Sequence, residues 1–94
     1  MARNAAAAAS MLKQIANEQR LRILCALAEG EASVGDIARH SNLSQSALSQ
    51  HLAKMRDEGL VTFRRERQTL LYRIADPRTA TLLATLYQLY CQKD

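Results

Sequence analysis

Hydrophobic positions in the first part of the chain recur at the spacing of amphipathic helices. Five consecutive alanines, followed by apolar residues at positions 11, 12, 15 and 16, predict a first helix over residues 4–16. Asn17 then suits a break or an N-cap. A second helix is predicted over residues 18–28, where apolar side chains stand at i, i+3, i+4 and i+7: Leu21, Leu24, Cys25 and Ala28. Gly30 is placed to end it in a left-handed conformation.

Two further helices, joined by a tight turn, follow. Ser33 begins a capping-box spacing that predicts a short helix over residues 34–40. Residues 41–44 read as a compact turn, and Ser44 caps a fourth helix over residues 45–57. The apolar side chains expected to face inward from the fourth helix are Leu48, Leu52 and Met55.

Beyond Gly59 the pattern changes to that of strands. Residues 60–64 and 69–74 are rich in β-branched and aromatic side chains and flank a polar segment, 65–68, which predicts a hairpin with a charged tip. Asp76 and Pro77 then suit the start of a last helix over residues 77–92. The expected fold is mainly α with a β-hairpin: a winged helix-turn-helix of five helices and one two-stranded wing, in a single domain over residues 1–94.

Composition places the excess charge in one part of the chain. The 94 residues are 48% hydrophobic and suffice for one packed domain. The net charge is +4, and residues 37–73 hold seven of the thirteen basic and three of the nine acidic side chains, so the whole excess lies there. This points to a local anionic partner, although a solvated basic face has the same composition. No segment has the length of a membrane span or the character of a signal peptide, and we expect a cytoplasmic protein.

The predicted fourth helix has the composition of a DNA-reading helix. Residues 44–53 contain no charged side chain, and short hydrogen-bonding groups of this kind can read base edges in the major groove. Arginines at the hairpin tip can hold phosphates or enter a minor groove. The alternatives are a neutral exposed face and a charged hairpin that only discourages edge pairing. The predicted DNA-binding residues are Ser44, Gln45, Ser46, Ser49, Gln50, His51, Arg64, Arg65, Arg67 and Gln68.

Four segments of the chain, at residues 16–24, 43–52, 57–61 and 64–72, together resemble the ArsR-type winged-helix repressors of bacteria over nearly the whole length. The resemblance implies a regulator rather than an enzyme. It implies a homodimer, formed by the first and last helices, that occupies an inverted-repeat operator in double-stranded DNA and leaves it when an inducer acts. An activator or anti-silencing role fits the same residues.

The residues do not form a metal site of the kinds known in this family. Residues 33–36 contain no cysteine, and residues 77–94 contain no histidine and one acid, Asp94. Because a metal site needs three or four converging ligands, we predict no metal and no cofactor, and a metal-responsive repressor is the alternative.

Two cysteines, Cys25 and Cys91, are the remaining chemistry-bearing groups. From spacing alone, Cys25 reads as a core residue and Cys91 as an incidental thiol. The sulfide- and persulfide-sensing branch of the family carries cysteines at these two positions, and the resemblance therefore implies a dithiol switch that responds to persulfide or polysulfide. A small thiol peroxidase or sulfur transferase using Cys91 is a further alternative, but a helix C-terminus disfavours a thiolate.

Overall fold

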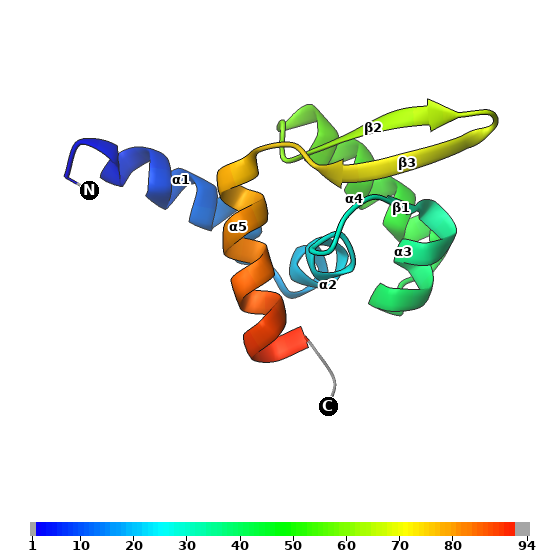
Figure 1. Ribbon diagram of the computed structural model, residues 1–94, viewed down its shortest axis with the longest axis horizontal. Coiled ribbons are helices and arrows are strands. Elements are labelled where there is room, and N and C mark those ends of the chain that lie inside the picture. Colours follow the sequence, from blue (N-terminus) through cyan, green and yellow to red (C-terminus); the bar gives the residue numbers. More distant parts are fainter. Residues whose placement is uncertain (1, 92–94) are drawn as a thin grey trace.

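The computed structural model describes residues 2–91, with side chains for residues 3–90, as a helical domain with one small sheet (Figure 1). A 3₁₀ turn, Ala2–Asn4, precedes the first helix, and a π-helix, Tyr87–Cys91, continues the last one. The five α-helices are α1 (Ala5–Ile15), α2 (Glu18–Ala26), α3 (Val34–Ser41), α4 (Gln45–Asp57) and α5 (Pro77–Leu86). The expected order of helices around a hairpin is confirmed.

Helices α2 to α5 begin where the sequence provides a side-chain cap. In each, the oxygen of the capping side chain accepts a hydrogen bond from a backbone N–H two or three residues further on, at 2.8–3.2 Å. This satisfies a backbone donor that has no partner inside the helix. The capping residues are Asn17, Ser33, Ser44 and Asp76.

The hydrophobic core lies where α2 meets the other elements. Ile23 and Leu24 of α2 are fully buried, and this helix packs against both α3 and α5. The inward residues expected on α4 are all at most 1% exposed. The buried apolar cluster consists of Ile15, Ile23, Leu24, Leu27, Ile37, Leu48, Leu52, Met55, Leu60, Val61, Tyr72, Ile74 and Leu83.

Helix α1 projects from this body. Figure 1 shows it extending past α5, with its N-terminal end away from the other elements. Ile15, its last residue, is its one buried side chain among those described, and Met11 packs partly against the core. The alanines at its start are mostly exposed. A helix that buries so little of its length gains little stability from this chain alone.

The sheet has three strands rather than the two expected for the wing. Strands β2 (Val61–Glu66) and β3 (Thr69–Ile74) form the predicted antiparallel hairpin, and β1 (Ala32–Ser33) pairs with the other edge of β3, giving the order β1-β3-β2. A two-residue strand has no periodicity to detect. It forms because the segment between α2 and α3 runs beside β3.

Several element ends also differ from the expectation. Helix α2 ends at Ala26, and Gly30, with φ +138°, lies beyond its last turn. The hairpin turn comprises two residues, 67 and 68, because Glu66 pairs with Thr69, so half of the expected tip belongs to β2. The last helix changes to π-helical geometry after Leu86, and its expected end at residue 92 lies outside the described residues. No described helix is long and apolar enough to cross a bilayer.

Candidate DNA interface

The turn before α4 sets the direction in which this helix leaves the core. Asn42 adopts the left-handed conformation, with φ +61°, and its N–H donates to Ala38 O at 3.0 Å, which ends α3. Asparagine tolerates this conformation better than most residues with a side chain. Ser44 then caps α4 by accepting from the Ala47 N–H at 3.1 Å. Ser44 was predicted to bind DNA, and its hydroxyl already has this structural task.

Helix α4 turns one face to the core, and in its first two turns it presents uncharged polar side chains to solvent. Leu48 and Leu52 hold it against the domain. His51 is half-buried, at the border between the two faces. The exposed side chains on the helical part of the predicted reading surface are Gln45, Ser46, Ser49 and Gln50. Four such side chains on one helix face present amide and hydroxyl groups without a fixed charge.

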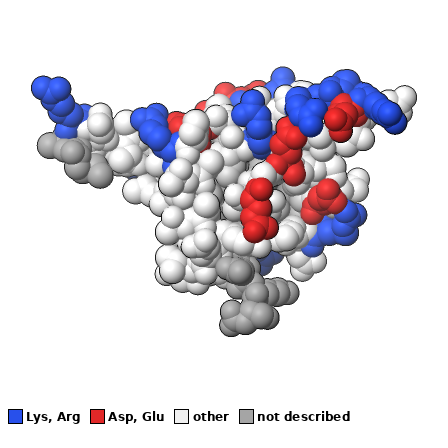
Figure 2. All heavy atoms as spheres, in the orientation of Figure 1, with Lys and Arg blue, Asp and Glu red and all other residues white. Residues whose placement is uncertain are grey.

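The wing carries basic side chains along its outer half. Arg65, Arg67 and Gln68 are exposed at or beside the turn. Figure 2 shows the blue spheres of lysine and arginine gathered over the part of the surface that the wing forms in Figure 1. Arg67 has φ +59°, which side-chain-bearing residues rarely adopt, so the turn holds this arginine in a strained backbone conformation.

Arg64, unlike Arg65 and Arg67, has an ion pair with another side chain among the described residues. Its Nε lies 2.7 Å from Oε2 of Glu31 and its Nη2 lies 3.0 Å from Oε1 of the same carboxylate, while Glu66 approaches to 3.5 Å. This hydrogen bonding lowers the pKa of Glu31 below its ordinary value and raises the pKa of Arg64. One arginine that the sequence assigns to DNA is thus paired with the segment before β1.

A stacked contact that the sequence analysis did not include joins α4 to the base of the wing. The Arg56 guanidinium carbon lies 4.7 Å from the centre of the Phe63 ring, and that ring lies 5.2 Å from the ring of Tyr72. A cation over an aromatic face is attracted by the ring quadrupole. The contact bridges the C-terminal part of the reading helix and strand β2, so it ties together the two halves of the candidate interface.

The two cysteines lie away from this interface in the sequence and on other helices. Cys25 is in α2, is 9% exposed and is disulfide-bonded. Cys91 ends the π-helix, and its side chain lies outside the described residues. Within the described part of the chain, no group of three or more His, Cys, Asp or Glu side chains is placed to hold a metal ion.

Comparison with known proteins places this geometry in a family. Residues 17–62 match the family described as "Bacterial regulatory protein, arsR family". The chain is 48% identical to the transcriptional activator HlyU of Vibrio cholerae, and the alignment covers 98% of this chain and 85% of HlyU. The solved structure of that HlyU matches with a TM-score of 0.81 over 98% of this chain and 100% of the HlyU chain.

Two further relatives support the same family assignment. The HTH-type transcriptional regulator YgaV of Escherichia coli is 45% identical over 89% of this chain and 86% of its own. The structure of the transcriptional repressor BigR of Xylella fastidiosa is 34% identical and matches with a TM-score of 0.81 over 99% of this chain and 95% of that one. The chain is therefore a member of the ArsR family of bacterial DNA-binding transcriptional regulators.

Proposed function

We propose that this chain is a homodimeric repressor of transcription that leaves its operator when reactive sulfur species oxidise a Cys25/Cys91 dithiol. The observation that carries the DNA-binding part is the exposed, uncharged polar face of α4 beside a wing with exposed arginines. The major groove of B-DNA is about 12 Å wide and admits an α-helix. In this arrangement, Gln45, Ser46, Ser49 and Gln50 read base edges, while Arg65 and Arg67 hold the sugar-phosphate backbone.

Exposed apolar side chains on α1 and at the end of the last helix support the dimer. Leu12 is 50% exposed, Leu89 is 67% exposed and Tyr90 is 82% exposed. Residues 79–91 contain no charged side chain, and Figure 2 shows a largely uncharged surface over the part of α5 that follows its first turn. A second copy of the chain would cover these groups, and two α4 helices related by a two-fold axis would read half-sites about 10 base pairs apart.

The sulfur chemistry needs two thiols and one sulfane-sulfur donor. A cysteine thiolate attacks the terminal sulfur of a persulfide, RSSH, which gives a protein persulfide and releases RSH. The second thiol attacks the cysteine sulfur of that persulfide and releases H₂S, so that two thiols are oxidised to a disulfide while RSSH is reduced to RSH and H₂S. A polysulfide donor would give the corresponding crosslink with extra bridging sulfur. The burial of Cys25 suits the second, resolving step.

The crosslink would act through the position of the last helix. Cys25 lies in the helix that packs against both α3 and α5, whereas Cys91 ends the last helix, which we assign to the dimer interface. A covalent bond between the two would change how the partner subunit is seated and thereby separate the two reading helices from their half-sites. The relatives include both a transcriptional activator, HlyU, and a transcriptional repressor, BigR, and the direction of regulation therefore needs a test of its own.

The DNA-binding part is tested by selecting duplexes from a random pool with the reduced protein and measuring affinity against salt. Arg65→Ala should weaken binding to all duplexes and lower the salt slope by about one, because it removes one phosphate contact. Gln50→Ala should reduce the preference for the selected sequence by about 1–3 kcal/mol at the contacted position. Arg22→Ala and Gln19→Ala, exposed positions on α2, serve as controls. Binding that is insensitive to both interface variants would contradict the assignment.

The sulfur switch is tested by gel shift of the selected duplex before and after treatment with inorganic polysulfide. Wild-type protein should lose affinity after treatment, whereas Cys25→Ser and Cys91→Ser should stay bound. Equal affinity of wild-type protein in both states would contradict the switch but leave DNA binding intact. A reporter gene with the selected duplex placed between its promoter and coding sequence shows whether the protein represses or activates transcription. If added metal ions, and not polysulfide, release the protein from the duplex, the result would favour a metal-responsive repressor.

A further inference from the structure

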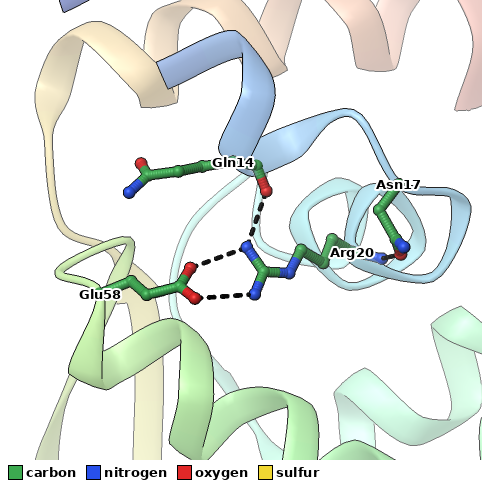
Figure 3. A network of polar contacts seen from close by, with 4 residues as sticks. All are labelled: Gln14, Asn17, Arg20 and Glu58. Atoms are coloured by element: carbon green, nitrogen blue, oxygen red, sulfur yellow. Dashed lines mark hydrogen bonds and ion pairs between the residues drawn. The ribbon is translucent and has the colours of Figure 1, made fainter. Parts of the chain in front are cut away.

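Arg20 joins three helices through one side chain (Figure 3). Its Nη1 donates to the backbone carbonyl of Gln14 in α1 at 2.8 Å and to Oε1 of Glu58 at 2.8 Å, and its Nη2 donates to Oε2 of Glu58 at 3.1 Å. The Arg20 side chain is 13% exposed and that of Glu58 is 29% exposed, so water screens this pair less than the surface pairs. Arg20 itself lies in the first turn of α2, after the cap at Asn17.

Each end of this network is fixed to its helix. Glu58 is the C-cap of α4, and the next two N–H groups close that helix: Gly59 donates to Arg56 O at 3.0 Å and Leu60 donates to Met55 O at 2.9 Å. This is the Schellman pattern, which holds the chain rigidly at a helix end. Gln14 is the second-last residue of α1. The guanidinium therefore connects the C-terminal ends of α1 and α4.

Helix α1 has few other contacts that fix its direction. Its one buried side chain among those described, Ile15, is adjacent to Gln14, Met11 packs partly against the core one turn earlier, and most residues before Met11 are exposed. These apolar contacts hold only the C-terminal part of the helix and constrain its direction weakly. The polar network adds directional hydrogen bonds that join this part of α1 to both α2 and α4.

We propose that Arg20 and Glu58 are positioning residues that set the operator half-site spacing by fixing the direction of α1 relative to α4. This inference rests on the proposed homodimer, in which α1 belongs to the interface and α4 to the DNA. The eleven residues of α1 span about 16 Å, so a swing of about 10° moves its far end by about 3 Å. One base pair advances a half-site by about 3.4 Å. A swing of this size would therefore be comparable to one base pair of spacing.

The test uses full-length variants and duplexes with altered spacers. The probe is the inverted repeat selected by the reduced wild-type protein, together with the same repeat shortened or lengthened by one base pair. Arg20→Lys keeps the charge but cannot donate to Gln14 and to both oxygens of Glu58 in the same geometry. Glu58→Gln keeps the size and removes the charge. Arg22→Lys and Glu18→Gln are matched controls, because that pair, at 2.7 Å, lies within α2 and joins no other element.

The measured quantity is the ratio of affinities for the native and the altered spacing. We expect this ratio to be about tenfold or more for wild-type protein and both controls, and to fall below about threefold for Arg20→Lys and Glu58→Gln. The ratio does not depend on the fraction of active protein, so partial unfolding of a variant does not mimic the effect.

Two results would overturn the inference, and they are distinguishable. If the variants remain dimers in sedimentation and keep the wild-type spacing ratio, Arg20 and Glu58 do not position the reading helix. If wild-type protein sediments as a monomer or binds all spacings equally, the proposed homodimer on an inverted repeat fails, and the inference fails with it. An unchanged affinity for the native spacing together with a reduced ratio supports the proposal.

Discussion

Glu58 links the stability of the domain to pH. The hydrogen bond from Arg20 lowers the pKa of this carboxyl below its ordinary value of 4.5. A group with a lowered pKa in the folded state stabilises that state above the pKa of the unfolded chain, and the contribution is lost as the pH falls through the folded-state pKa. The contribution of this pair is therefore fully present near neutral pH and is lost progressively as the pH falls below about 4.5.

We predict that Glu58→Gln lowers the free energy of unfolding by an amount on the order of 1 kcal/mol near pH 6, and that this difference shrinks toward zero in acid. Thermal or urea unfolding between pH 3 and pH 7 measures it. Glu18→Gln, in an exposed pair within one helix, is the control and should change stability little. A difference between wild-type protein and Glu58→Gln that stays constant down to pH 3 would show that the ion pair is not its cause.

Ser41 is a second residue with a measurable consequence. It is the last residue of α3, is 2% exposed, and its Oγ has no hydrogen-bond partner among the described residues. A buried hydroxyl without a partner costs about 1–3 kcal/mol of desolvation. We predict that Ser41→Ala leaves the fold intact and raises the urea midpoint by an amount on the order of 0.5–1 M, given a slope of about 1–3 kcal/mol per molar. A lowered midpoint would show that the hydroxyl has a partner in solution.

Ion pairs between residues far apart in the sequence were the least predictable feature of this chain. The sequence identified the side chains that cap helices, because a capping side chain and the backbone N–H that it binds are only two or three residues apart. The sequence did not indicate that Arg20 pairs with Glu58 or that Arg64 pairs with Glu31. The two residues of these pairs are 38 and 33 positions apart, respectively. Nothing in the neighbouring sequence points to Glu58 as the partner of Arg20 or to Glu31 as the partner of Arg64, because the fold brings these carboxylates to the arginines.

At the scale of elements, the wing turn combines a strained backbone with a basic side chain. Arg67 has φ +59°, a value that glycine adopts without steric cost. We predict that Arg67→Gly stabilises the domain by up to about 1 kcal/mol and at the same time weakens DNA binding, because it removes a cation from the tip. Thermal unfolding and salt-dependent affinity measured on the same variant check both signs. Arg65→Ala, which removes a cation from a strand, should weaken binding without stabilising the domain.

Helices were easier to predict than the edges of the sheet. Periodic apolar positions and caps located all five helices, and the hairpin followed from two β-branched segments separated by polar residues. Strand β1 and the π-helical end could not be anticipated, because two residues beside β3 and a change in helical geometry depend on packing rather than on local pattern. The candidate reading face was predictable in the same way as its helix. Gln45, Ser46, Ser49 and Gln50 are exposed as expected, whereas His51 is half-buried.

At the scale of the whole molecule, the exposed apolar groups predict the behaviour of the assembly. Tyr90 is 82% exposed at the end of the last helix. We predict that Tyr90→Glu gives a folded protein that sediments as a monomer at micromolar concentration and binds a two-half-site duplex at least about tenfold more weakly. Gln19→Glu introduces the same charge on an exposed part of α2 and should remain dimeric. A dimeric Tyr90→Glu protein would place the interface elsewhere.

The pairing of Arg64 with Glu31 affects how strongly the affinity for DNA depends on salt concentration. Salt weakens a contact between Arg64 and a phosphate, because the counterion that the contact releases returns more readily to DNA. Salt also screens the attraction between Arg64 and Glu31, which makes it easier for Arg64 to leave that carboxylate. The two effects have opposite signs, so Arg64 adds less to the salt exponent than an unpaired arginine would. A titration with potassium chloride would therefore report fewer phosphate contacts than the wing makes, and Glu31→Gln would restore the missing one.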